Sequence, residues 1–150
     1  MNRRVMDFNG EAEMITSGEE QTLALAERFA HHLKPGDVVA LYGEMGTGKT
    51  HFVKGVVKGL GGDPDNVDSP TFAIINEYGA GGSVYHMDCY RLSSEEEAEV
   101  IGVPSYFDGM GICLIEWPER IEGLLPPSTI RIKLEHKSPT ERSFMITTSS

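Results

Sequence analysis

Apolar and polar positions alternate along the chain with two different periods, which predicts helices interleaved with strands. Over residues 23–33 the apolar side chains recur at the spacing of one helical face. Ser17-x-x-Glu20, just before them, has the form of a capping box, and Lys34-Pro35-Gly36 ends the helix. The next run, Val38–Tyr42, is apolar and contains two valines, so we predict a buried strand there.

Shorter apolar runs predict the remaining elements. A helix is expected over about residues 49–60, and the two runs at 72–78 and 83–88 predict a hairpin around the glycines of 79–82. A helix capped by Ser93 or Ser94 follows, and further strands are expected at 112–115, 129–134 and 143–148. Strands and helices in this order predict an α/β sandwich with a mixed, partly parallel sheet, formed by one domain over residues 1–150.

Composition limits the classes of partner and compartment. No apolar run approaches the roughly 20 residues of a membrane span, and the N-terminal residues lack the apolar core of a secretory signal. The two cysteines, Cys89 and Cys113, do not form a disulfide framework, so we expect a reduced, cytoplasmic protein. The formal net charge of −10 argues against direct binding of nucleic acid, whereas docking onto a more basic protein stays open.

The stretch Gly43–Thr50 matches the phosphate-loop pattern G-x-x-x-x-G-K-[ST], and it lies between a predicted strand and a predicted helix. Gly43, Gly46 and Gly48 allow backbone amides to approach phosphate oxygens closely. The first amides of the helix are a second source of anion binding. Lys49 can reach the β- and γ-phosphates, and the Thr50 hydroxyl suits Mg²⁺. We therefore predict a nucleotide site of the P-loop NTPase kind.

An ATPase also needs a carboxylate near the metal, and two predicted strands end in one. Glu116 follows the apolar run at 112–115, and Asp88 follows the run at 84–87. If both strands run parallel to the strand before the phosphate loop, both acids lie at the ligand-binding edge of the sheet. The alternative is that each is an ordinary surface acid. His86 shares a strand face with Asp88, but the sequence offers no further ligands for a zinc site.

Two other features fit a nucleotide site, although each has a plainer explanation. Trp117 follows Glu116 directly and could cover the nucleotide, but packing in the core is the safer expectation for a single tryptophan. Ser69-Pro70-Thr71 lies where a nucleotide switch can sense the γ-phosphate, and it is also ordinary turn chemistry.

Together, four stretches of the sequence resemble one family. GEMGTGKT at 43–50, DSPTF at 68–72, YHMDCYRL at 85–92 and LIEWPERI at 114–121 occur in the order and spacing of the TsaE family, also called YjeE. These bacterial P-loop ATPases are required to make threonylcarbamoyladenosine in tRNA. The resemblance extends from about residue 20 to residue 142, and the YHxDxYRL and EWP patterns are far more specific than the phosphate loop.

The resemblance implies roles for individual residues. Thr50 and Glu116 would hold Mg²⁺, Asp88 would lie beside the γ-phosphate as a catalytic or water-positioning acid, and Thr71 would belong to the switch segment. Nucleotide binding is assigned to Gly43, Gly46, Thr47, Gly48, Lys49, Thr50, His51, Phe52, Trp117 and Arg142. His51 is a departure, since the family often has a second hydroxyl residue there. Residues 19–22 would lie near the adenine.

The resemblance also implies what the ATP is used for. The protein would be an accessory ATPase that acts on the TsaB–TsaD pair and meets tRNA only through that complex. Two other classes stay open from the residues alone. A small-molecule P-loop kinase would need an acceptor pocket and an arginine-bearing lid, and the sequence contains no long insertion with clustered arginines. A nucleotide-gated binding module would hydrolyse almost no ATP. The presence of two candidate catalytic carboxylates, Glu116 and Asp88, favours an ATPase over such a module.

Overall fold

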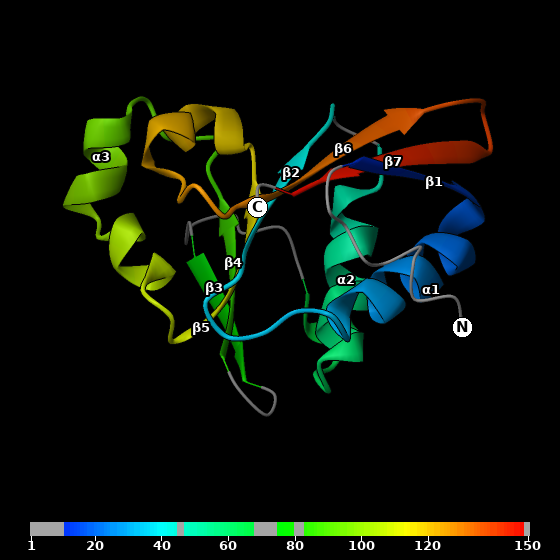
Figure 1. Ribbon diagram of the computed structural model, residues 1–150, viewed down its shortest axis with the longest axis horizontal. Helices are drawn as coiled ribbons and strands as arrows, with labels where there is room; N and C mark the ends of the chain where they lie inside the picture. Colours follow the sequence, from blue (N-terminus) through cyan, green and yellow to red (C-terminus); the bar gives the residue numbers. More distant parts are fainter. Residues whose placement is uncertain (1–10, 45–46, 68–74, 80–82, 149–150) are drawn as a thin grey trace.

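The strands pair into a single seven-stranded sheet with a parallel centre (Figure 1). The computed structural model describes residues 11–44, 47–67, 75–79 and 83–148. In these residues the chain forms β1 (Glu11–Ser17), α1 (Gly18–Ala30), β2 (Val38–Tyr42), α2 (Lys49–Gly59), η2 (Pro64–Asn66), β3 (Ile75–Gly79), β4 (Ser83–Asp88), α3 (Glu95–Val100), η3 (Val103–Phe107), β5 (Gly111–Glu116), η4 (Pro118–Leu124), β6 (Ile130–His136) and β7 (Glu141–Thr147), where η is a 3-10 helix.

The strand order is β1-β7-β6-β2-β5-β4-β3. The four central strands β6, β2, β5 and β4 are parallel, while β3, β7 and β1 each pair antiparallel with a neighbour. This arrangement confirms the predicted mixed, partly parallel α/β sheet and the predicted β3–β4 pairing. It also places the carboxyl ends of the four parallel strands along one edge, which is where α/β proteins bind ligands.

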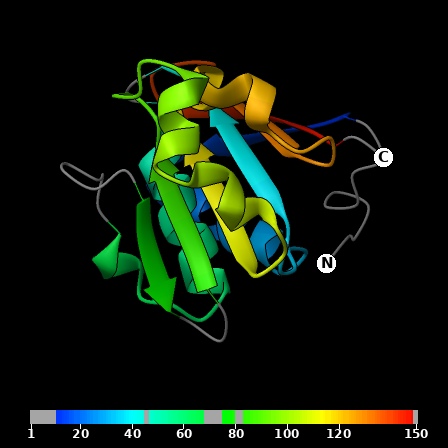
Figure 2. The ribbon, with the colours of Figure 1, turned by 90° about the vertical axis from the view of Figure 1, so that its left-hand side faces the viewer.

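Helices cover the two faces of the sheet with two separate apolar cores. α1 and α2 pack on one face, and α3, η3 and η4 lie on the opposite face; Figure 2 shows this second group in front of the sheet and α2 behind it. β2 and β5 lie between the two layers, so nearly all of their residues are buried. That double burial explains why these strands are continuous apolar runs rather than alternating ones.

α1 and α2 approach each other closely because α2 has glycines at the contact. A Cβ on Gly55 would lie 2.5 Å from the Cβ of Ala26 and 2.6 Å from the carbonyl oxygen of Leu23. A Cβ on Gly59, one turn further along, would lie 2.6 Å from the carbonyl oxygen of Glu27. Any side chain at either position would push the helices apart. The glycines therefore fix how deeply α2 sits against α1.

The N-terminal part differs from the sequence prediction in two ways. The predicted capping box is wrong. Within the described residues the Ser17 side chain makes no capping hydrogen bond to α1, and the Ser17 amide donates to Gln21 Oε1 (2.7 Å) instead of to Glu20. The strand β1, which begins at Glu11, was not predicted. The helix also ends earlier than expected, at Ala30, although Leu33 still packs against the core.

Other expectations agree with the structure. Ser94 caps α3 by accepting a hydrogen bond from the Glu97 amide (3.1 Å). Cys89 and Cys113 are both buried and free. Across the described ranges, the helices lack the length and apolar character that crossing a bilayer requires.

Candidate nucleotide-binding site

The phosphate loop joins the end of β2 to the start of α2, as predicted. Residues 45–46, and so Gly46, lie outside the described residues. A Cβ on Gly43 would come within 2.8 Å of Thr47 Oγ1 and 2.9 Å of the Leu134 carbonyl oxygen, so only glycine fits there. Gly48 has φ +99°, and among the described residues no side chain caps α2 at this end. The first amides of α2 are thus directed toward the loop, an arrangement that binds anions.

Lys49 is held at the centre of the site. Its Nζ lies 2.5 Å from the Gly43 carbonyl oxygen and 4.2 Å from the centroid of the Trp117 ring. The residue is only 6% exposed. Burial lowers the pKa of Lys49, and the negative charges of Glu116, Glu119 and Asp88 oppose that shift. Because the ammonium is largely desolvated, little water screens its attraction to a bound phosphate.

The two candidate acids meet beside the phosphate loop. Asp88 and Glu116 are register partners at the ends of the parallel strands β4 and β5, and Glu116 is also the register partner of Leu41 on β2. This confirms the prediction that both acids reach the same edge of the sheet. Glu116 is buried, at 5% exposure, whereas Asp88 is half-buried and accepts a hydrogen bond from the Tyr90 amide (3.0 Å). The two carboxylates therefore have different environments.

His86 contacts Glu116 rather than forming a metal pair with Asp88. Its Nε2 lies 2.6 Å from Glu116 Oε2. Within the described residues there is no group of three or more His, Cys, Asp or Glu side chains that could hold a metal ion. Mg²⁺ does not require one, because it is usually bound by one or two protein oxygens together with substrate phosphates and water. Thr50 in the first turn of α2 and Glu116 at the end of β5 are chemically suited to that mode.

Trp117 both packs in a core and borders the site, so the expectation of core packing alone is incomplete. The residue is half-buried against the core on the α3 side, and its backbone has φ 57°. Its ring also lies below the Lys49 ammonium and 4.9 Å from the ring of Tyr90. A left-handed backbone at a non-glycine residue is unfavourable, and surrounding contacts must maintain it.

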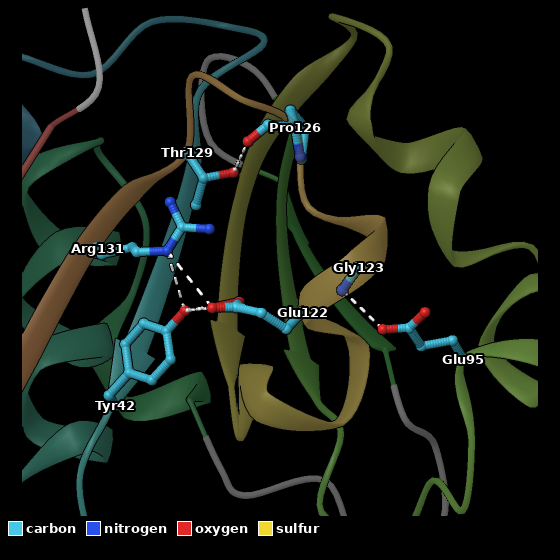
Figure 3. A network of polar contacts seen from close by, with 7 residues as sticks. All are labelled: Tyr42, Glu95, Glu122, Gly123, Pro126, Thr129 and Arg131. Atoms are coloured by element: carbon cyan, nitrogen blue, oxygen red, sulfur yellow. Dashed lines mark hydrogen bonds and ion pairs between the residues drawn. The ribbon is translucent and has the colours of Figure 1, made fainter.

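Two sets of polar contacts hold the segment that follows Trp117 (Figure 3). Tyr42 Oη donates to both Glu122 oxygens at 2.9 Å, and Arg131 Nε lies 3.2 Å from Tyr42 Oη. Together with burial, the Glu122 contact raises the pKa of Tyr42 to about 12. On the other side, the Gly123 amide donates to Glu95 Oε2 (2.6 Å). The sequence offered no signal for these contacts, since they join residues up to 89 positions apart.

The remaining candidates, in the loop and in the first turn of α2, each make a different contact. Thr47 Oγ1 donates to the Glu44 carbonyl oxygen (2.7 Å), which closes the loop on itself. His51 Nε2 lies 3.2 Å from Glu19 Oε2, so the start of α1 adjoins the start of α2. The Phe52 side chain is fully buried between Phe29 and Phe144, and can serve the site only by anchoring α2.

One predicted site residue lies away from these contacts. Arg142 is on β7, opposite His136 and two strands away from β2, and its guanidinium donates to the Glu141 carbonyl oxygen (3.4 Å). Its assignment as a nucleotide contact stays a prediction. Thr71 and the rest of the expected switch segment lie outside the described residues.

Comparisons with known proteins agree on one family. The family model of "Threonylcarbamoyl adenosine biosynthesis protein TsaE" matches residues 16–144. The chain is 44% identical over 133 residues to a tRNA threonylcarbamoyladenosine biosynthesis protein TsaE of Bacillus subtilis, covering 88% of this chain and 82% of that protein. It is 38% identical over 124 residues to the protein of that name from Haemophilus influenzae, covering 79% and 78%. Among solved structures, the crystal structure of Bacillus subtilis YdiB matches with a TM-score of 0.77 and 35% identity, over 93% of this chain and 86% of that one.

Proposed function

This chain belongs to the TsaE family of tRNA threonylcarbamoyladenosine biosynthesis proteins, and from that premise we propose that it binds ATP with Mg²⁺ and hydrolyses it slowly. The observation that supports this most is the convergence of three groups. The Glu116 and Asp88 carboxylates lie side by side where β5 and β4 end, next to β2, and both interact electrostatically with the Lys49 ammonium. Phosphoryl transfer depends on placing positive and negative groups in this way around the transferred phosphate.

Each residue has a defined part in the proposed site. Lys49 and the first amides of α2 bind the phosphates. For this, the Lys49 ammonium gives up its hydrogen bond to the Gly43 carbonyl oxygen and donates to the phosphates instead. Thr50 and Glu116 supply oxygens to Mg²⁺, which neutralises charge on the β- and γ-phosphates when it is bound. Asp88 is less buried than Glu116 and orients the attacking water. The Trp117 ring packs against the Lys49 ammonium and supports it. Thr71 belongs to a segment that responds to the γ-phosphate.

We further propose that hydrolysis is coupled to partner proteins of the tRNA-modifying machinery, namely TsaB and TsaD. With a net charge of −10, this chain is suited to docking on a more basic protein and not to gripping tRNA itself. The loop from Gly43 to Thr50 contains no arginine. P-loop proteins that lack part of their catalytic set hydrolyse slowly until a partner completes or orders it.

The test is phosphate release from ATP and Mg²⁺ with and without TsaB and TsaD. We expect about one turnover per minute or less for the protein alone, and a clear rise when both partners are present. Thr71→Ala should blunt that rise more than it weakens ATP binding. Glu99→Ala, an exposed acid on α3, is the control that should behave as wild type.

The same assay separates the other functional classes. Release that depends on a small-molecule acceptor would identify a kinase. Release that is negligible under every condition would identify a binding module. Equal turnover with and without both partners, at saturating ATP, would overturn the proposed coupling and leave an autonomous ATPase.

A further inference from the structure

A buried hydrogen bond joins His86 to the carboxylate that the proposed function assigns to the metal. His86 Nε2 lies 2.6 Å from Glu116 Oε2, and both side chains are almost completely enclosed, at 0% and 6% exposure. A carboxylate oxygen can only accept, so the proton in this contact belongs to His86 Nε2. A buried carboxylate without a donor would be strongly unfavourable, and His86 supplies that donor.

The strand register brings these two side chains together. On β4, His86 lies opposite Leu114 of β5, while Asp88 lies opposite Glu116. Since side chains alternate along a strand, His86, Asp88 and Glu116 all project from the same face of the sheet. His86 therefore approaches Glu116 from the buried side, two residues before the strand ends, and Asp88 lies on the side of the open edge.

The other ring nitrogen of His86, Nδ1, also has a polar neighbour. Tyr78 on β3 lies opposite Val84 of β4, and its Oη is 3.5 Å from His86 Nδ1, with the two rings 6.2 Å apart. The polar contacts thus run from β3 through β4 to β5. They fix the imidazole in position before any ligand binds, and with it the orientation of the Glu116 carboxylate.

We propose that His86 is a positioning residue that holds Glu116 Oε2 and leaves Oε1 as the oxygen that serves the nucleotide-bound Mg²⁺. This inference rests on the proposed function, because it assumes that Glu116 serves the metal. It assigns no chemistry to His86 itself. Hydrogen-bond partners of metal-binding carboxylates commonly change metal affinity by about 10- to 100-fold when they are removed, and the same range is expected here.

Two amide substitutions with different reach test the inference. In His86→Gln, the side-chain amide nitrogen can occupy nearly the position of Nε2 and still donate to Glu116. In His86→Asn, the amide nitrogen is closer to the position of Nδ1 and cannot reach the carboxylate. Both keep a polar group in the same buried site. His136→Asn, the same change at an exposed histidine on β6, is the matched control.

The readout is metal binding, with Mn²⁺ as a spectroscopic probe. Electron paramagnetic resonance measures the affinity of the ADP-bound protein for Mn²⁺, and calorimetry in EDTA measures its affinity for ADP without metal. For His86→Asn we expect Mn²⁺ affinity to fall by about 10- to 100-fold while metal-free ADP affinity stays within about twofold. His86→Gln should retain most of the Mn²⁺ affinity, and His136→Asn all of it.

The outcomes distinguish this inference from the proposed function. Unchanged Mn²⁺ affinity in folded His86→Asn, together with a loss in Glu116→Ala, would overturn the role of His86 alone. Unchanged Mn²⁺ affinity in Glu116→Ala would overturn the metal role of Glu116 and the inference with it. An equal fall of metal-bound and metal-free ADP affinity in His86→Asn would show a merely structural role and reject the inference.

The wild-type protein provides a second test that does not depend on a variant folding. In protein with ¹⁵N-labelled histidine, the His86 Nε2 signal should shift when Mg²⁺ is added to the ADP complex, because the Glu116 carboxylate then shares its charge with the metal. ADP in EDTA should move it much less. A His86 signal that does not respond to Mg²⁺ would contradict the inference.

Discussion

The position of α2 depends on the glycine at its contact with α1, and replacing Gly55 by alanine should disturb both stability and nucleotide binding. The new Cβ would lie 2.5 Å from the Ala26 Cβ, 2.6 Å from the Leu23 carbonyl oxygen and 3.2 Å from the Leu23 Cα. Two of these three atoms belong to the backbone of α1 and cannot turn aside. Because carbon atoms in contact prefer about 3.5–4.0 Å, the helices would have to separate by roughly 1 Å.

Two opposing effects determine the size of the change. Alanine favours a helix over glycine by about 1 kcal/mol, which stabilises the variant. Overpacking a well-packed contact typically destabilises by about 1–3 kcal/mol, and the two backbone contacts place Gly55 at the upper end. We therefore expect a net loss of about 2 kcal/mol in the free energy of unfolding, or a fall of about 4–8 °C in Tm for a chain of this size.

The functional effect follows from what α2 presents to the site. Lys49 and Thr50 lie in its first turn, six and five residues before Gly55, so a shift of the helix moves both. A misplacement of about 1 Å at a site can reduce its activity by about 100-fold. Urea denaturation and ADP calorimetry are the assays, with Lys54→Ala on the same helix as a control expected within about 0.5 kcal/mol of wild type. A Gly55→Ala variant as stable as wild type, with unchanged ADP affinity, would refute the reasoning.

Three further outcomes are expected. Lys49→Ala should weaken ADP binding by about 10- to 100-fold, because a charge-assisted contact is lost; unchanged calorimetric affinity in the folded variant would contradict this. Asp88→Asn should lower kcat for ATP hydrolysis with little change in ADP affinity, since the negative charge is lost and the side-chain size is kept. A kcat equal to that of the wild type would show that Asp88 has no catalytic role. Burial raises the pKa of Cys89 and Cys113 from 9.0 to about 12, and the pKa of Tyr42 is raised from 10.0 to about 12. The folded protein then keeps protons that the unfolded chain releases, so the free energy of unfolding should fall as pH rises from about 9 to about 12, and urea titrations that are flat over this range would disprove it.

The central strands were predictable because of how they are buried. Val38–Tyr42 was predicted with the bounds that the structure shows, and the strand before Glu116 was predicted nearly as well. A parallel strand covered on both faces must be apolar at almost every position, so its sequence is unmistakable. The same reasoning placed Asp88 and Glu116 together, since parallel strands must end at one edge of the sheet.

Where burial is one-sided, the sequence signal was too weak. β1 lies at the edge of the sheet and has only a partial alternation: Met14 and Thr16 face the core, but the outward-facing Ile15 is 54% exposed. That apolar residue on the outer face obscures the period of two by which such a strand is recognised. The prediction of a capping box at the start of α1 failed for another reason. Gln21 and Glu20 can both reach back to the Ser17 amide, and only the geometry of the turn selects Gln21.

The contact between His86 and Glu116 shows which part of a site the sequence pattern leaves open. The spacing of His86 and Asp88 predicts that they share a face of β4, but a slip of β5 by two residues would keep every side chain on its face. Such a slip would place His86 directly opposite Glu116 and leave Asp88 beyond the end of the strand. The observed register instead puts Asp88 beside Glu116 at the edge and His86 behind it. Whether Glu116 is oriented from inside the sheet, and thus whether His86 affects metal binding, depends on a register that the side-chain pattern alone does not determine.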